Sequence, residues 1–246
     1  MSRTVLITGA SRGIGRATAL AFAALGDRVA INHRDSAALA AELRDEMAGD
    51  GHIVVQGDVV DPDAVRNMVD EVAANLGRID VLVNNAGVYA PHPIMEVTYT
   101  EWQAQWRATL DTNLIGAANV IWCAVRHMRA GGRIVNVSSR GAHRGEPDHP
   151  AYGASKAGLN ALAQSLATPL GSLGIGVATI APGYVDTDMA RPYLNSPADA
   201  EIRAQSPFDR VATSEEVAAA IVWLASPEAE WASGSILDFN GATYFR

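Results

Sequence analysis

The chain has 246 residues, of which 48 % are hydrophobic, and its formal net charge is −8 at pH 7. This length and composition favour a single domain over residues 1–246, and the lack of a signal-peptide pattern or long apolar stretch favours a cytoplasmic protein that does not span a membrane. The negative charge argues against nonspecific nucleic-acid binding, the single Cys123 excludes an intrachain disulfide, and the six histidines show no metal-binding spacing.

Short β-branched runs alternate with helical patterns from one end of the chain to the other. The expected strands are residues 4–8, 28–32, 52–57, 79–84, 133–138, 175–180 and 235–239. The expected helices are residues 13–25, 36–48, 62–76, 100–129, 150–171 and 214–225. Several strands are almost continuous in apolar residues, which is typical of a parallel sheet covered by helices on both faces. The pattern predicts an α/β fold with a doubly wound parallel sheet of about seven strands.

Two segments depart from this regular alternation. Residues 100–129 are long for one helix, and we expect a break near Thr112 and Asn113. Residues 182–207 are rich in Pro and Asp and follow the carboxyl end of a strand, where open α/β sheets bind their ligands. This second segment is therefore interpreted as a mobile substrate lid.

The first strand ends in a glycine-rich loop that leads directly into a helix. The run is Thr8-Gly9-Ala10-Ser11-Arg12-Gly13-Ile14-Gly15. Glycines let the backbone turn sharply and approach a pyrophosphate, while the helix N-terminus supplies N–H donors and the positive end of a dipole. No Gly-Lys-Ser/Thr follows, which disfavours a nucleoside-triphosphate loop. The loop predicts a dinucleotide site, with a plain glycine turn as the alternative.

Lys156 is the only lysine in a chain that contains 18 arginines, and it follows Tyr152 by four residues. Positions four apart share one face of a helix, so the two side chains can meet. A nearby ammonium favours phenolate over phenol and lowers the tyrosine pKa from its reference of about 10. The pair is therefore a candidate acid or base, the alternative being a surface lysine that happens to follow a tyrosine.

Further motifs accompany the glycine loop and the Tyr-Lys pair in a fixed order. They are Asn84-Asn85-Ala86-Gly87, Asn113, Ser139 at thirteen residues before Tyr152, and Pro182-Gly183 followed by Thr187. Together they resemble the short-chain dehydrogenase/reductase family in its compact, single-domain branch with a Rossmann-type fold. Within the family, Gly-Ala-Ser-Arg-Gly-Ile-Gly and the Asn240-Gly241 tail most resemble the 3-oxoacyl-carrier-protein reductase type.

The resemblance implies a catalytic role for four residues. Tyr152 would give its proton to a carbonyl oxygen as hydride arrives, or take it back in oxidation. Lys156 would lower the tyrosine pKa and hold the nicotinamide ribose hydroxyls. Ser139 would hydrogen-bond the substrate oxygen, and Asn113 would bend a helix and hold a water that relays protons to Lys156. Taken alone, Ser139 could equally be a turn or helix cap, and Asn113 a solvated helix residue.

The resemblance also implies where the cofactor would lie. Asn85, Ala86 and Gly87 would line its adenosine half, with Asp58 and Val59 beside the adenine. Asp58 has an alternative role as a turn or helix-capping residue. The residues that would frame the nicotinamide are Pro182, Gly183, Val185 and Thr187.

The end of the second strand indicates which dinucleotide is preferred. NAD enzymes need a carboxylate there for the ribose 2′-OH, and a carboxylate would repel a 2′-phosphate. Here His33 stands at that position and Arg34 follows it, while Arg12 in the glycine loop could contact the same phosphate. NADP(H) is therefore expected over NAD(H), although Asp35, two residues after His33, would restore an acid if the register differed.

These observations predict a reversible hydride transfer between NADP(H) and a ketone or secondary alcohol, mainly as a carbonyl or 3-oxoacyl reductase. A sugar or polyol dehydrogenase is the alternative substrate class, and a non-catalytic cofactor-sensing or scaffold protein is the alternative from another class. An acyl carrier protein partner would need basic residues. Ser172-Leu173-Gly174 lacks one, although Arg129 and Arg133 could supply another. Family likeness implies a homo-oligomer, a tetramer or dimer. The pocket candidates are Tyr89, His143, Arg144, Tyr184, Met189 and Tyr193.

Overall fold

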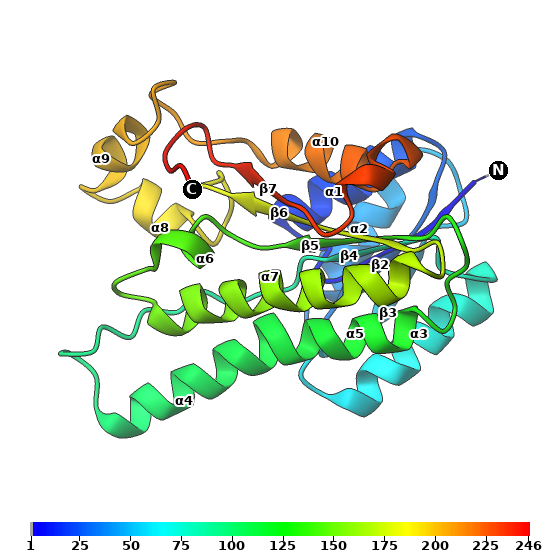
Figure 1. Ribbon diagram of the computed structural model, residues 1–246, viewed down its shortest axis with the longest axis horizontal. Helices are drawn as coiled ribbons and strands as arrows, with labels where there is room; N and C mark the ends of the chain where they lie inside the picture. The colour runs from blue at the N-terminus through cyan, green and yellow to red at the C-terminus, as the bar shows by residue number, and fades with distance from the viewer. Residues whose placement is uncertain (1) are drawn as a thin grey trace.

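A seven-stranded parallel sheet runs through the centre of the computed structural model, which describes residues 2–246 (Figure 1). The strands are β1 Thr4–Ile7, β2 Arg28–His33, β3 Ile53–Gln56, β4 Val81–Asn84, β5 Arg133–Val137, β6 Gly176–Pro182 and β7 Ile236–Phe239. Their spatial order is β3-β2-β1-β4-β5-β6-β7, so the chain first winds outward from β1 to β3 and then returns to β4 on the other side. The predicted doubly wound sheet of seven strands is confirmed.

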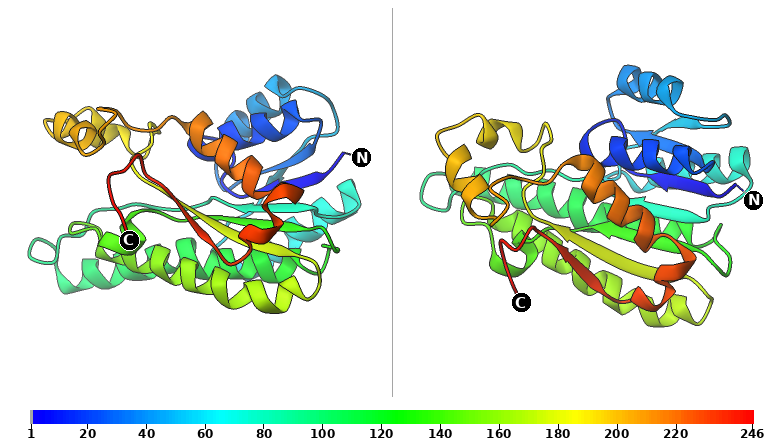
Figure 2. Two further views of the ribbon diagram at one scale, coloured as in Figure 1. Left: turned by 45° about the horizontal axis from the view of Figure 1, so that its top comes forward. Right: turned by 90° about the horizontal axis from the view of Figure 1, so that it is seen from above.

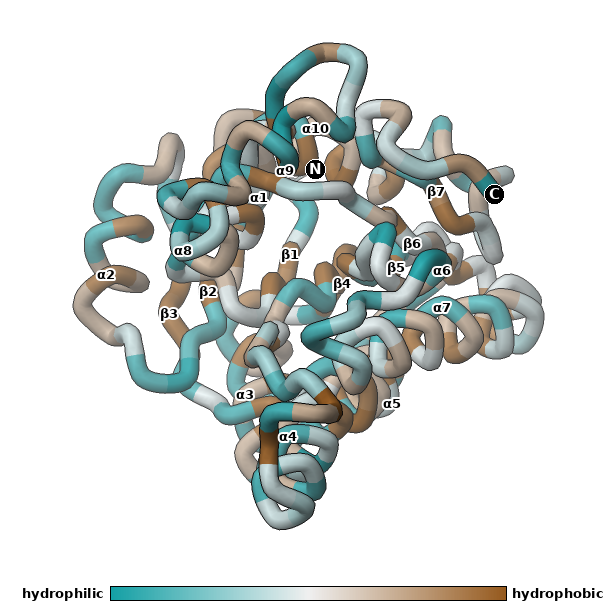
Figure 3. The backbone as a smooth tube through the Cα atoms, turned by 90° about the vertical axis from the view of Figure 1, so that its left-hand side faces the viewer, coloured by the Kyte–Doolittle hydropathy of each residue, from teal (hydrophilic) through white to brown (hydrophobic). Residues whose placement is uncertain are grey.

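Helices cover both faces of this sheet, as Figure 3 shows along the strands. One face packs against α1 Gly13–Ala24, α2 Ala37–Glu46 and α10 Ser214–Leu224. The other packs against α3 Pro62–Leu76, α5 Ala117–Ala124 and α7 Pro150–Gly171. Each strand serves both layers because its side chains alternate: Val5 and Ile7 belong to the first core, and Leu6 to the second. Cys123 lies in the second core.

The helical stretch 100–129, in which we expected a break, consists of three consecutive pieces. The helix α4 Tyr99–Leu110 starts at a capping box in which Thr98 and Glu101 bond each other's backbone N–H groups. A π-helical segment, Asp111–Gly116, follows, and α5 continues from it only to Ala124. The break is therefore at the predicted position. The helix ends five residues earlier than expected, because His127 already turns its carbonyl to the Ile79 N–H (3.2 Å).

Short helices that the sequence analysis did not predict gather at the carboxyl edge of the sheet. These are α6 Gly141–Arg144, α8 Arg191–Leu194 and α9 Asp199–Ala204. Figure 2 shows α8 and α9 projecting from one end of the molecule, away from the main helical layers. Their apolar residues form a small separate core of Ala190, Leu194 and Ile202. The remaining short element is a 3₁₀-helix, Pro227–Ala232, before β7.

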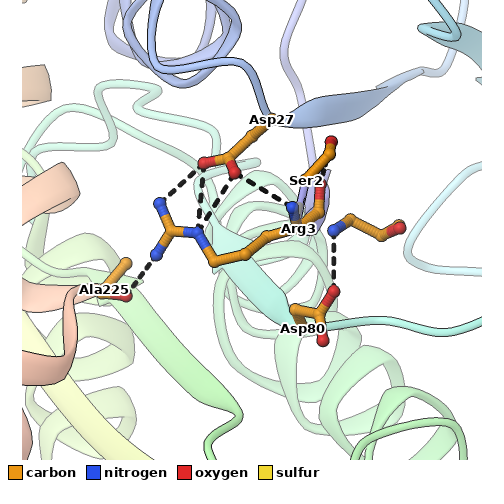
Figure 4. Close-up of polar contacts among 6 residues, drawn as sticks. Ser2, Arg3, Asp27, Asp80 and Ala225 are labelled. Atoms are coloured by element: carbon orange, nitrogen blue, oxygen red, sulfur yellow. Dashed lines mark hydrogen bonds and ion pairs between the residues drawn. The ribbon is translucent and has the colours of Figure 1, made fainter.

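An ion pair anchors the start of the chain (Figure 4). The guanidinium of Arg3 donates to both carboxylate oxygens of Asp27, with a closest distance of 2.6 Å, and to the carbonyl of Ala225 at 2.9 Å. Only 6 % of the Asp27 side chain is exposed. Nearby, Asp80 accepts the backbone N–H of Thr4 at 2.8 Å. These contacts hold β1 in place between β2 and β4.

We expect Arg3→Leu to lower the free energy of unfolding by about 3 kcal/mol, because it leaves a buried carboxylate without its cation. The matched control is Arg44→Leu. Arg44 pairs with Asp45 at the surface, where both side chains are well exposed. That change should cost less than about 1 kcal/mol. Urea unfolding of both variants gives the comparison, and equal losses would contradict the assignment of Arg3 as an anchor.

No helix within residues 2–246 is long and apolar enough to cross a membrane.

Candidate active site

A cavity of about 680 Å³ opens at the carboxyl edge of the sheet, where the loops after β1, β2, β3, β4, β5 and β6 meet. Open α/β sheets bind ligands at this edge, next to the strand where the winding reverses. Most of the predicted site residues line it: Gly9, Arg12, Gly13, Ile14, Arg34, Asp58, Val59, Asn85, Ala86, Gly87, Ser139, Tyr152, Lys156, Pro182, Gly183, Val185 and Thr187. Of the six pocket candidates, Tyr89, Tyr184, Met189 and Tyr193 line the cavity and His143 and Arg144 do not.

The glycine loop is built for close approach. Gly13 begins α1 with a φ of +50°, and α1 has neither a capping side chain nor an acidic residue in its first turn. Its N-terminal N–H groups and dipole are thus free to face an anion. Gly15 lies behind the loop, where a Cβ would come within 2.5 Å of the Gly9 carbonyl. Asn85 secures the loop from below by donating to the carbonyls of Thr8 and Gly9, both at 3.0 Å.

Four predicted site residues do not line the cavity: Ser11, Gly15, His33 and Asn113. His33 is the informative case, because we expected it to take the place of a ribose-binding carboxylate. It is 4 % exposed, and its Nδ1 is buried with no hydrogen bond. Side chains alternate along a strand. Its neighbour Asn32 therefore lies at the cavity and accepts the Gly9 N–H (3.2 Å).

Arg34 and Asp35 both reach the cavity where β2 ends. The Arg34 Nε donates to the Asp35 carboxylate at 2.5 Å, and both side chains are largely exposed. Asp35 is the carboxylate that could bind a free ribose 2′-OH, and it forms an ion pair with Arg34 instead. Asp58, in the loop after β3, accepts the Val60 N–H at 3.0 Å. It therefore also stabilises a turn, which was the alternative role considered for it in the sequence.

Tyr152 and Lys156 lie one turn apart on α7 and face the same cavity. The Lys156 Nζ is 5.7 Å from the centre of the Tyr152 ring and donates to the Val137 carbonyl at 2.8 Å. Lys156 is only 4 % exposed. An ammonium has three donors, so two remain for other partners. The sequence-based expectation that this pair meets across a helix turn agrees with the observed geometry.

The pKa values of the pair depart from what the sequence suggested. Burial raises the pKa of Tyr152 to about 12, which outweighs the lowering by a hydrogen bond from Ser139. Burial also lowers the pKa of Lys156 to about 8. The expected lowering of the phenol pKa by the ammonium is therefore absent in this state, because desolvation dominates both groups. Tyr152 stands as a protonated donor at neutral pH.

Ser139 follows β5 and lies beside the phenol. Its Oγ accepts the Gly141 N–H at 3.0 Å, which fixes the hydroxyl at the start of α6. Ser138, immediately before it, donates instead to the Lys156 carbonyl at 3.2 Å and ties β5 to α7. Both serines line the cavity, but the Ser138 hydroxyl is used on the Lys156 carbonyl, whereas the Ser139 oxygen accepts the Gly141 N–H and its own O–H remains a donor.

Among residues 2–246, no group of three or more His, Cys, Asp or Glu side chains is arranged to hold a metal ion.

The chain is similar to known proteins over nearly its whole length. A family model described as enoyl-(acyl carrier protein) reductase matches residues 9–241. The 3-oxoacyl-(acyl-carrier-protein) reductase FabG of Staphylococcus aureus (strain Mu50) is 36 % identical over 248 residues, covering 99 % of each chain. The acetoacetyl-CoA reductase of Shinella zoogloeoides is 37 % identical over 248 residues and covers 100 % of each.

Solved structures agree over nearly the whole chain. A short-chain dehydrogenase from Burkholderia cenocepacia J2315 in complex with NADP is 34 % identical with a TM-score of 0.88, over 98 % of this chain and 97 % of that one. The structure of BdcA in complex with NADPH is 32 % identical with a TM-score of 0.86, over 98 % and 93 % respectively. The chain belongs to the short-chain dehydrogenase/reductase family. The resemblance drawn from the sequence motifs, and with it the oxidoreductase class, is confirmed.

In this short-chain dehydrogenase/reductase, Asn113 connects three elements from beneath the cavity. Its side chain accepts the Val88 N–H at 2.8 Å, donates to the Val88 carbonyl at 3.0 Å, and donates to the Ser155 hydroxyl at 3.1 Å. It sits in the π-helical segment, which accounts for the predicted bend. Both amide donors are used by protein partners, so the side chain fixes the loop after β4 against α7.

An aromatic cluster closes one wall of the dehydrogenase cavity. The Tyr89 ring stacks on His149 with 3.7 Å between ring centroids and meets the Tyr152 ring edge-on at 4.7 Å. His149 in turn hydrogen-bonds the Tyr193 hydroxyl of α8 at 2.8 Å. Burial lowers the pKa of His149 to about 4, so its ring is neutral at physiological pH. The cluster connects α8 with the Tyr152 side chain.

Sequence reasoning missed several residues that line the cavity. The most notable is Arg140, which directly follows Ser139, together with Asn32, Glu146 and Thr112. The position of Arg140 next to a candidate catalytic serine was the available signal. Arginine is common in this chain, however, and nothing in the sequence distinguishes a buried arginine from a surface one.

Proposed function

We propose that this short-chain dehydrogenase/reductase transfers hydride between NADP(H) and a ketone or secondary alcohol, acting mainly as a reductase of 3-oxoacyl compounds. The observation that carries the proposal is that Ser139, Tyr152 and Lys156 border the same cavity as the glycine loop. One pocket thus offers a pyrophosphate cradle and a set of hydrogen-bond donors for a carbonyl oxygen. When bound, the cofactor would supply or accept the hydride.

The residues present fit a dinucleotide. Gly9 and Gly13 adopt positive φ, and the space that a Cβ at Gly13 would need is taken by Thr187, whose methyl group lies 3.1 Å from that point. The uncapped N-terminus of α1 suits the pyrophosphate, while Asp58 and Val59 would border the adenine. Pro182, Gly183, Val185 and Thr187 would hold the nicotinamide end. Two similar structures are complexes with NADP and with NADPH, which supports a cofactor of this kind.

The proposed mechanism assigns the proton to Tyr152. A ketone oxygen in the cavity would accept hydrogen bonds from the Ser139 and Tyr152 hydroxyls, which lie together at the end of β5 and the start of α7. As hydride reaches the carbonyl carbon, charge develops on this oxygen, and the phenol gives up its proton to it. A phenol with a pKa of about 12 is protonated at the start of this step, as reduction requires.

Lys156 would act on the tyrosine rather than on the substrate. Its ammonium would stabilise the phenolate that forms when Tyr152 loses its proton. Its two free N–H donors can hold ribose hydroxyls. Asn113 would keep the floor of the site in position through Val88 and Ser155. The side-chain amide of Asn113 already bonds Val88 and Ser155, so a relay water would have to be held by another group.

We propose NADP(H) over NAD(H) on the basis of Arg34 and Arg12, both of which line the cavity. Arg34→Ala should weaken NADPH binding by about 1–3 kcal/mol while changing NADH binding far less, because it removes a charge-assisted contact to the 2′-phosphate. The matched control is Arg44→Ala, which also lies beside a following aspartate but outside the cavity. Fluorescence titration with both cofactors is the measurement, and equal affinities in the parent would contradict the preference.

The 3-oxoacyl class rests on the curated relatives named above, both of which are named for reduction of a 3-oxo group. The family model instead carries the name of an enoyl reductase. A steady-state panel of acetoacetyl-CoA, crotonyl-CoA and a neutral ketone with NADPH, and of polyols with NADP⁺, separates the classes. We expect turnover with the ketones. Turnover with crotonyl-CoA alone would replace the proposal by an enoyl reductase, and turnover with polyols alone would replace it by a polyol dehydrogenase.

Arg129 and Arg133, the two basic residues considered in the sequence for docking an acyl carrier protein, give that role little support. Arg133 is 4 % exposed, and its guanidinium pairs with Glu230 at 2.9 Å, so it is not available at the surface. Arg129 is exposed, but it precedes β5 and thus lies at the edge of the sheet opposite the cavity of its own chain. Docking near this chain's own pocket would need other cations.

We propose that residues 182–207 act as a substrate lid and that the protein forms a homo-oligomer. The lid is supported by the Tyr193–His149 hydrogen bond and by the separate apolar core of α8 and α9. Oligomer formation is supported by exposed apolar side chains on several surfaces, among them Trp122 on α5 and Phe245 near the C-terminus, which are 55 % and 79 % exposed. A tetramer or a dimer would cover such side chains.

A further inference from the structure

Arg140 is a buried cation without a partner. It is 2 % exposed, and its side chain makes no hydrogen bond or ion pair with any of residues 2–246. Its Nη1 is fully buried and unbonded. Arg140 nevertheless lines the active-site cavity, directly after Ser139, and its backbone N–H is fixed by the Pro182 carbonyl at 2.8 Å. A guanidinium has five N–H donors, so this is an unusual arrangement in a folded chain.

The charged and aromatic neighbours of Arg140 do not satisfy it. Glu146 is the carboxylate that acts on it most strongly, but Glu146 pairs with Arg144 at 3.5 Å and is more than 4.0 Å from the Arg140 guanidinium. Asp188, which also lines the cavity, pairs with Arg191 at 2.8 Å. The Tyr184 ring lies 5.4 Å from the guanidinium carbon. This stacking offers an aromatic face but no acceptor for the N–H donors.

A buried guanidinium of this kind is costly in the free protein, since an uncompensated charge away from water destabilises the fold. An anionic ligand in the cavity would supply the missing charge and the missing hydrogen-bond acceptors. Arginine suits a carboxylate in particular, because its planar fork can give two parallel hydrogen bonds. Arg140 lines the same cavity as Ser139 and Tyr152, and its guanidinium carbon lies 5.4 Å from the ring of Tyr184, which also lines that cavity.

We infer that Arg140 binds an anionic oxygen group of the substrate, and that the preferred ketone carries a carboxylate close to the carbon that is reduced. This inference rests on the hydride transfer to a ketone in the proposed function, and it favours a free 3-oxo acid over a 3-oxoacyl thioester. Arg140 and Ser139 line one cavity, and the Arg140 guanidinium lies by Tyr184 in that cavity, so the bound anion and the ketone would share it. A phosphate on the long arm of an acyl carrier or of coenzyme A is many bonds from the ketone and fits this position less well.

The direct test compares two ketones that differ only in charge. Acetoacetate and acetoacetamide have nearly the same shape, and the wild-type enzyme with NADPH should show a kcat/KM for the anion at least about 10-fold higher. Acetoacetyl-N-acetylcysteamine and acetoacetyl-CoA, neutral and phosphate-bearing, form the second arm. Equal kcat/KM for acetoacetate and acetoacetamide would overturn the inference. A preference seen only for the CoA thioester would indicate that Arg140 binds a phosphate of coenzyme A. That result would overturn the assignment of a carboxylate.

Two variants of Arg140 give a readout that a merely structural role would not move. In Arg140→Met, the ratio of kcat/KM for acetoacetate over acetoacetamide should fall to about one, and in Arg140→Lys it should be partly restored. The ratio is internal to each variant, so a general loss of activity does not affect it. An unchanged ratio in Arg140→Met would contradict the inference, as would a loss of NADPH affinity in place of the change in ratio.

If Arg140→Met does not fold, inhibition of the wild-type enzyme still tests the role of Arg140. Acetate and its homologues should inhibit reduction of acetoacetate competitively, while the matching amides should inhibit at least about 10-fold more weakly. Equal inhibition would count against Arg140. Failure of the whole proposed function is distinguishable, because it would appear as no oxidation of NADPH with any ketone, charged or neutral.

Discussion

Tyr152→Phe should lower turnover of a ketone by between about 100-fold and 10,000-fold, the range that a positioned acid contributes. The change removes only the hydroxyl, so the ring should keep its edge-on contact with Tyr89. We expect NADPH affinity to stay close to that of the parent, because the phenol contacts the reacting oxygen. Steady-state kinetics with NADPH titration measures both quantities.

The matched control for this variant is Tyr193→Phe. Tyr193 borders the same cavity and hydrogen-bonds His149, yet it lies on α8 in the proposed lid and has no proton-transfer role in the mechanism. Its effect should fall mainly on KM, through closure over the substrate. Tyr152→Phe with turnover within about 10-fold of the parent would be inconsistent with general acid catalysis by this residue.

Lys156→Arg should cost at least about 100-fold in turnover, or roughly 2.7 kcal/mol of barrier. The variant keeps the charge, but a planar guanidinium cannot reproduce the compact ammonium that is 4 % exposed and bonded to Val137. Circular dichroism and thermal unfolding serve as folding controls. Near-parental turnover would show that the position needs only a charge.

The pH dependence of this variant is a second readout. The pKa of Lys156 is lowered to about 8, so its ammonium is present below that pH and is lost as the pH rises through it. Reductive turnover of the parent should therefore fall on the alkaline side near this value. Arginine stays charged throughout, so the falling limb should move to higher pH in Lys156→Arg. An unmoved limb would contradict the role given to the Lys156 charge.

Lys156 also offers a chemical test, because its amine can be modified selectively. The chain has no other lysine, so an amine-directed reagent can modify only this side chain and the terminal amine. Bound NADP(H) should protect Lys156 if the ammonium holds the ribose. Turnover should fall in proportion to the modification found at Lys156 by peptide mass spectrometry.

The sequence was sufficient to predict the sheet and most of the cavity. The parallel strands are short apolar runs that serve two cores, and such runs are visible in the sequence because neither face needs polar residues. The glycine loop and the Tyr152–Lys156 pair were equally accessible, because turn geometry and helical spacing act over a few residues. Prediction was reliable where the structure depends on local sequence.

Prediction failed where one residue decides between two directions or two partners. His33 and Asn32 are adjacent on a strand, and only the packing against the glycine loop determines which one faces the cavity. The end of α5 depends on a carbonyl of residue 127 that bonds distant Ile79. Arg140 could not be distinguished from surface arginines, since its contacts with Pro182 and Tyr184 come from residues more than 40 positions away.

A single-turnover experiment tests the central claim most directly, that Tyr152 protonates a ketone as NADPH reduces it. The enzyme is saturated with NADPH, mixed rapidly with a ketone, and followed by the nicotinamide absorbance. The account predicts that one equivalent of NADPH is consumed in the parent, and that Tyr152→Phe, with cofactor bound equally well, reacts at least about 100-fold more slowly. Equal rates in the two proteins, or no reaction of the parent with any ketone, would contradict it.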